Sequence, residues 1–112
     1  MAAGIDTAAH LGALDHGGGA TVAVLGHGLG RTYPRSNTAL RRRIVEEGGA
    51  VVSCWPDEQA PARWTFPVRN RWVAGLSDYA IVVEAPWGSG ALLTAKDALA
   101  LGRQVFVVPG RP

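Results

Sequence analysis

The sequence predicts an α/β fold: a Rossmann-like three-layer αβα arrangement with a mainly parallel sheet. Two observations predict it. Short runs of β-branched residues alternate with longer segments of helical periodicity, and glycines close most of the helical segments. A length of 112 residues suits one small domain. Because 47% of the residues are hydrophobic, the composition excludes an intrinsically disordered chain.

The first half predicts two helices and two strands. We expect a helix over residues 6–15, a buried strand over 21–25 and a glycine loop over 26–30. A second helix over 37–47 and a second strand over 50–53 should follow. The glycine loop needs close backbone approach or positive φ. Ser36 or Asn37 can cap the second helix, whose Leu40, Ile44 and Val45 are expected to face inward.

The second half continues the same alternation. We expect a proline-rich loop over residues 55–67 and a short helix over 69–76. A strand over 79–84, a helix over 89–101 and a strand over 104–108 should follow. Proline prevents the long loop from being regular for more than a few residues. We therefore interpret this loop as functional.

Cysteine content and apolar segments indicate the cellular compartment that we expect for the protein. Cys54 is the only cysteine, so neither an intramolecular disulfide framework nor a cysteine-based zinc cluster is expected. No apolar run approaches the roughly 20 residues that span a bilayer, and the N-terminus lacks the features of a secretory signal. These features predict a cytoplasmic protein without a membrane partner.

Charge is informative through its distribution. The chain has 11 basic and 9 acidic residues, a net charge of only +2, but all the basic residues except Lys96 are arginines, and most of these are grouped. Arginine is suited to bidentate phosphate contacts and to stacking on bases. Tryptophans near these groups are candidate stacking platforms, although Trp72, at helical spacing, is expected in the core.

Motifs along the whole chain carry a family resemblance. They include Gly4-Ile5-Asp6, Ala23-Val24-Leu25-Gly26, Tyr33-Pro34, Phe66-Pro67, Arg69-Asn70-Arg71, Ala74-Gly75-Leu76-Ser77, Ser89-Gly90 and Val108-Pro109-Gly110. In these residues the chain resembles the DNA-processing protein A family, also called DprA or Smf. The resemblance implies a Rossmann-like domain that binds single-stranded DNA without catalysis or a cofactor. It also implies loading of the RecA recombinase during natural transformation, and self-association as a homodimer.

Two departures from the family pattern stand out. Family members carry a strand, a Gly-Ser-Arg phosphate-binding loop and a further strand before the Gly-Ile-Asp helix. Residues 1–112 therefore resemble a partial, N-terminally truncated domain that lacks the first strands. The family usually has an acidic residue where this chain has Cys54.

Arg69-Asn70-Arg71 is the strongest candidate binding site. At a helix start, free N–H groups and two guanidinium groups would favour an anion, and nearby Phe66 offers a stacking face for an unpaired base. The bland alternative is a solvated helix start with a structural asparagine cap. The family resemblance favours the DNA interpretation.

A second candidate lies where a strand passes into a helix. Ser89, Gly90 and Thr94 can present hydroxyl and N–H groups to a phosphate. The alternative is a tight turn followed by an ordinary N-cap. Asp6 and His10, at i and i+4, could hold a metal, but a structural hydrogen bond is expected instead. His27 could contact a base from its glycine loop.

Two other functions remain open at this point. A nucleotide-binding sensor or a phosphoribohydrolase-like enzyme of the related fold family would need a Pro-Gly-Gly-x-Gly-Thr loop, where this chain has Pro86-Trp87-Gly88-Ser89-Gly90. A non-functional truncated gene product that does not fold alone is the other alternative.

Overall fold

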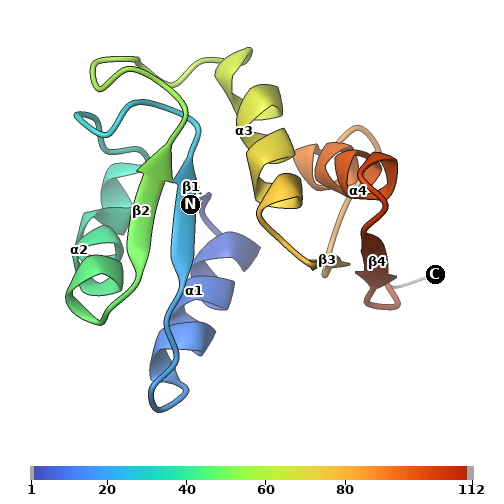
Figure 1. Ribbon diagram of the computed structural model, residues 1–112, viewed down its shortest axis with the longest axis horizontal. Coiled ribbons are helices and arrows are strands. Elements are labelled where there is room, and N and C mark those ends of the chain that lie inside the picture. The colour runs from blue at the N-terminus through green and yellow to red at the C-terminus, as the bar shows by residue number, and fades with distance from the viewer. Residues whose placement is uncertain (1, 111–112) are drawn as a thin grey trace. The chain divides into compact units, whose positions relative to one another are not determined.

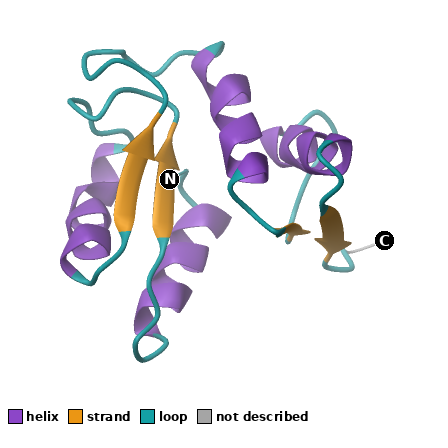
Figure 2. Ribbon diagram, in the orientation of Figure 1, coloured by secondary structure: helices purple, strands orange, loops and turns teal. Residues whose placement is uncertain are grey.

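The computed structural model describes residues 2–110, which divide into two compact units: the first ends at Ala62 and the second begins at Arg63. Within the described residues, each unit contains two α-helices and one pair of parallel strands (Figures 1 and 2). The predicted α/β class and the parallel pairing are confirmed. No helix in this part of the chain is long and apolar enough to cross a membrane.

The first unit is built around strands β1 and β2. Its elements are α1 (Ile5–Asp15), β1 (Val22–Leu25), the short 3-10 helix η1 (Arg35–Asn37), α2 (Thr38–Glu46) and β2 (Ala50–Ser53). The two strands pair in parallel, with Ala23 opposite Val51. Because parallel neighbours need a long crossover, α2 returns the chain from the end of one strand to the start of the next.

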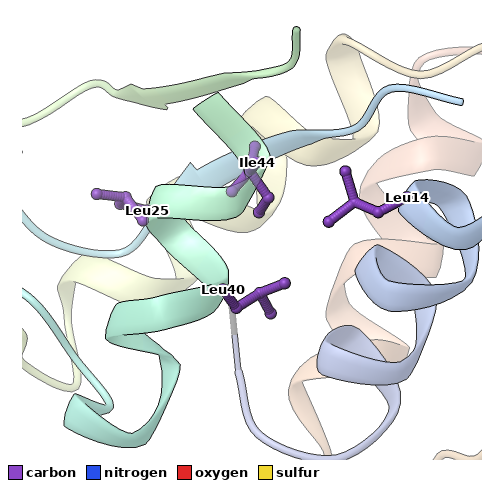
Figure 3. Packing of buried hydrophobic residues seen from close by; sticks show 5 residues of the cluster. Leu14, Leu25, Leu40 and Ile44 are labelled. Carbon is purple, nitrogen blue, oxygen red and sulfur yellow. The ribbon is translucent and has the colours of Figure 1, made fainter. Parts of the chain in front are cut away.

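The core of the first unit lies between its two helices and one face of β1. Ala23 and Leu25 alternate along the strand, so both point to this face. They pack in one cluster with Leu14 of α1 and with Leu40 and Ile44 of α2. Leu14 points toward the two α2 side chains (Figure 3). Ile44, which is fully buried, is the centre of this packing.

Two expectations for α2 were wrong. Val45 is 57% exposed, because it lies about 100° around the helix from Ile44, away from the core. Asn37 does occupy the N-cap position, but its side chain caps nothing. Its Nδ2 instead donates to Thr7 Oγ1 of α1 at 3.1 Å. A tertiary hydrogen bond thus replaces the local one.

The glycine loop after β1 packs against the loop after β2. The Gly28 N–H donates to the carbonyl of Gln59 at 2.9 Å, and the Gly30 N–H donates to that of Asp57 at 2.8 Å. A Cβ at Gly28 would overlap the carbonyl oxygens of Pro56 and Asp57. Close backbone approach is therefore the reason for glycine here, and the partner is the protein's own backbone.

The second unit repeats the parallel pairing. Its elements are α3 (Thr65–Gly75), β3 (Tyr79–Val82), α4 (Gly90–Ala100) and β4 (Gln104–Val107). The strands pair with Ala80 opposite Val105. Helices α3 and α4 pack together, and each contributes a nearly inaccessible alanine, Ala74 and Ala98. Such small side chains let two helices approach closely.

Within residues 2–110 the strands pair as β1–β2 in the first unit and β3–β4 in the second. Helix α3 begins at Thr65, four residues before the expected start. Pro67 is accepted there because a first-turn nitrogen needs no hydrogen-bond partner. Trp72 was expected in the core but is 51% exposed.

Replacing Ile44 by alanine should lower the free energy of unfolding by about 2–5 kcal/mol, because the change leaves a cavity in the core of the first unit. The matched control is the exposed neighbour Val45→Ala, expected within about 0.5 kcal/mol of wild type. Circular dichroism during thermal unfolding measures both. A melt of the wild-type chain without a cooperative transition would instead favour the non-folding gene product.

Gly28→Ala should destabilise the chain by roughly 1–3 kcal/mol, because its new Cβ overlaps two carbonyl oxygens and the paired loops must separate. Gly17→Ala is the control, since a Cβ there meets no atom within 4 Å. The urea midpoints of the two variants give the comparison. Equal midpoints would show that the loops do not need close contact.

Candidate functional site

The predicted site residues all lie in the second unit, on α3 and at the beginning of α4. They are Phe66, Arg69, Asn70, Arg71, Ser89, Gly90 and Thr94. A cation–π contact and two hydrogen bonds join four of them in series: Phe66, Arg69, Asn70 and Gly90. Thr94 also donates to the Gly90 carbonyl. The two candidate regions of the sequence thus lie in contact with each other.

Arg69 is the buried centre of this site, with only 9% of its surface exposed. Its Nε donates to Asn70 Oδ1 at 3.0 Å. Its guanidinium carbon lies 5.4 Å from the centroid of the Phe66 ring, within cation–π range. A buried cation is costly unless it is compensated, so the ring and the amide stabilise this arginine in place.

Asn70 connects α3 to the first residue of α4. Because its Oδ1 accepts from Arg69, its Nδ2 is oriented away and donates to the Gly90 carbonyl at 3.4 Å. Asn70 is 8% exposed, so it acts as a tertiary link and not as the cap of a solvated helix start that the alternative interpretation supposed. The two hydrogen bonds need one acceptor and one donor on the same side chain. An ionised aspartate has no donor and leucine has neither group, so neither residue could replace this asparagine.

The N-terminus of α4 is not capped by a side chain. Ser89 occupies the N-cap position with extended backbone, φ −73° and ψ 157°, but its Oγ makes no capping bond. That Oγ is buried without a hydrogen-bond partner among the described residues. The Thr94 hydroxyl donates to the Gly90 carbonyl at 3.2 Å and is therefore engaged locally. Ser89 therefore does not act as an ordinary N-cap. The first N–H groups of this eleven-residue helix favour an anion at its N-terminus.

Arg71 lies apart from the buried network. It is exposed, and two residues correspond to about 200° of helix rotation, which places it on the other side of α3 from Arg69. The prediction that these residues start a helix was wrong, because α3 begins at Thr65. Free N–H groups of a helix start are consequently not found at Arg69, and its guanidinium must act by its charge.

The histidines and the cysteine play other parts. His10 Nδ1 lies 2.8 Å from Thr21 Oγ1, so its hydrogen bond is structural, but the partner is Thr21 and not the expected Asp6 one helical turn away. His27 is 2% exposed, and its Nδ1–H donates to the Gly28 carbonyl at 2.9 Å. Cys54 is exposed. Across residues 2–110, no group of three or more His, Cys, Asp or Glu side chains is placed to hold a metal.

Comparison with known proteins identifies the family. The model of the DNA recombination-mediator protein A family matches residues 1–112. The chain belongs to this family. Family membership confirms the resemblance found in the motifs and does not favour the phosphoribohydrolase-like alternative.

Individual relatives agree with this assignment. Protein Smf of Escherichia coli (strain K12) is 46% identical over 110 residues, which are 98% of this chain and 29% of the relative. DNA processing protein DprA of Streptococcus pneumoniae is also 46% identical over 110 residues, 98% of this chain and 38% of the relative. The chain thus spans about a third of the length of these relatives.

A solved structure shows the same fold. The X-ray structure of DNA processing protein A (DprA) from Streptococcus pneumoniae superposes with a TM-score of 0.85 at 44% identity, covering 96% of this chain and 38% of that one. The helices and parallel strands described above are therefore those of a DprA-type α/β fold.

Sequence reasoning did not single out the contact between Phe66 and Arg69, although both were predicted site residues. Their spacing of three on a helix was the available signal, because residues three apart are neighbours on a helix surface. It also did not separate Trp87 from the other tryptophans. Trp87 is 99% exposed, and the Pro-Trp-Gly-Ser order around it is typical of a turn tip.

The stability of the first unit should depend on pH through His10. Burial is the main cause that lowers the pKa of His10 below its ordinary 6.5, and Asp6 opposes it more weakly. The unfolded chain therefore takes up a proton at a higher pH than the folded one. Stability from the neutral imidazole is fully present above about pH 6.5 and is lost as the pH falls toward the lower folded pKa.

His10→Gln tests this dependence, because glutamine can still bond Thr21 but does not titrate. Urea unfolding between pH 5 and 8 should show a stability difference, wild type minus variant, that shrinks or reverses as the pH drops below about 6.5. A difference that stays constant over this range would contradict the role assigned to His10.

Proposed function

We propose that this chain is a non-enzymatic module that binds single-stranded DNA at the α3–α4 site. The observation that carries the proposal is the buried Arg69–Asn70–Gly90 link, which fixes a guanidinium group beside an uncapped helix N-terminus. A cation and a helix N-terminus in one rigid place form an anion site suited to a phosphodiester backbone.

The bases of an unpaired strand need a different kind of contact. Aromatic rings bind them by stacking, which is independent of sequence. Phe66 is part of the same network as Arg69, so an aromatic face and a cation occur together. This combination supports single-stranded nucleic acid over a free phosphate, which has no base to stack.

The relatives named DNA processing protein support a role in DNA processing. We propose that the chain supports DNA uptake in natural transformation and the loading of RecA onto the bound strand, as the family resemblance implies. We also propose a homodimer in the cytoplasm. Each two-stranded sheet has outer strand edges of the kind that pair with other chains.

Arg71 is exposed on the other side of α3 from Arg69, so it tests whether the bound strand also contacts that side of the helix. Arg71→Ala should weaken binding of an oligo-dT strand several-fold and reduce the slope of log affinity against log salt by roughly 0.7, the value for one phosphate contact on a single strand. Fluorescence anisotropy over a range of NaCl concentrations measures both quantities. Arg42→Ala is the matched control, since Arg42 is also an exposed helical arginine but lies on α2 of the other unit.

Arg69→Ala belongs in the same series, with its melting temperature measured in parallel. Loss of the buried guanidinium should weaken binding and also lower the melting temperature, because Asn70 loses the donor that orients it. Affinity equal to wild type in both the Arg69 and Arg71 variants would remove these residues from the site.

A further inference from the structure

Trp87 is the most exposed large apolar side chain among those described, at 99%. Trp64 and Trp72, also in the second unit, are 59% and 51% exposed. An indole side chain is large and mainly apolar, and it contributes to folding only where it is buried. Trp87 therefore adds almost nothing to the stability of the fold, and its position calls for a role outside folding.

The backbone around Trp87 is fixed in a turn. The Ser89 N–H donates to the Pro86 carbonyl at 3.0 Å, which closes a four-residue turn with Trp87 and Gly88 at its tip. Gly88 has φ 76°, a conformation that favours glycine, and Pro86 restricts the entry to the turn. The indole is thus presented to solvent from a defined position and not from a loose tail.

The turn leads directly into the candidate site. Ser89, which closes the turn, is also the N-cap residue of α4, and Gly90 after it accepts the hydrogen bond from Asn70. An exposed aromatic face consequently lies within three residues of the uncapped helix N-terminus. One face of Phe66, the other aromatic ring of the site, is already directed at the Arg69 guanidinium.

We propose that Trp87 stacks on an unpaired base of a nucleic-acid strand whose phosphate lies at the N-terminus of α4. This inference rests on the proposed function and adds a base-contacting residue to it. A ligand that carries a phosphate next to a planar base matches the pairing of an uncapped helix N-terminus with an adjacent exposed indole. An apolar protein partner would use the indole but has no anion for the helix N-terminus.

The experiment compares two strands of equal length: oligo-dT and an abasic phosphodiester strand that has no bases. Affinities for both are measured by anisotropy for wild type, Trp87→Ala, Trp87→Phe and the control Trp72→Ala. Trp87→Ala should bind oligo-dT roughly 5- to 150-fold more weakly, the range for loss of one stacked base. Trp87→Phe should recover most of this loss, and affinity for the abasic strand should not change.

Because Trp87 is fully exposed, Trp87→Ala is expected to melt like wild type, so a loss of binding cannot be ascribed to unfolding. Wild-type binding of oligo-dT that Trp87→Ala leaves unchanged would overturn the inference while the proposed function stands. An equal loss for both strands would also overturn it, since stacking requires a base. A wild-type chain that binds neither strand would refute the proposed function and the inference with it.

Discussion

Parallel pairing of strands that are close in sequence is the constraint on which both units depend. β1 is joined to β2 through α2, and β3 is joined to β4 through α4. Parallel neighbours cannot be connected by a tight hairpin, so each pair needs a helix in its connection. The same geometry places the carboxyl ends of both strands of a pair at one edge. Loops gather there, and that edge is where α/β proteins usually bind ligands.

The two units use this edge differently. In the first unit, the backbone of the loop after β2 packs against the glycine loop after β1. The N–H groups of Gly28 and Gly30 donate hydrogen bonds to carbonyl groups of that loop. No ligand is needed to explain these glycines, because the protein's own carbonyl groups occupy the space that a Cβ would take. In the second unit, the loop after β3 ends at a helix N-terminus that no side chain caps. Helix α2 of the first unit also lacks a side-chain cap, so what distinguishes the loop after β3 is the buried Ser89 Oγ, which has no hydrogen-bond partner among the described residues.

Burial of Arg69 links the stability of the second unit to the residues of the candidate site. Its charge is compensated by an aromatic face and an amide oxygen, and the amide passes the restraint on to the first residue of α4. Removing one member leaves the others without their partners, which costs more than the loss of one contact. Arg71 and Trp87, which are exposed, can contribute to binding without this coupling. The candidate site thus has a buried part around Arg69, whereas Trp87 and, on the other side of α3, Arg71 are exposed.

The sequence by itself determined the α/β class, the order of the elements, the residues of β2 and the family. These follow from local periodicity, from glycine at helix ends and from motifs that are read directly along the chain. The residues of the candidate site were also proposed from such motifs, although the contacts that join them were not.

Tertiary structure decided what those residues do. Asn37 and Ser89 are residue types typical of N-caps. Yet the Asn37 side chain bonds to Thr7 of another helix, and the Ser89 side chain makes no capping hydrogen bond. Arg69 and Asn70 look like a solvated helix start but are buried, because α3 begins four residues earlier at Thr65. Trp72 and Val45 fit an apolar helical spacing and still face solvent. The physical reason is the same in each case: a pattern reports which residues can share a face, whereas burial and hydrogen-bond partners depend on which other segment packs against that face.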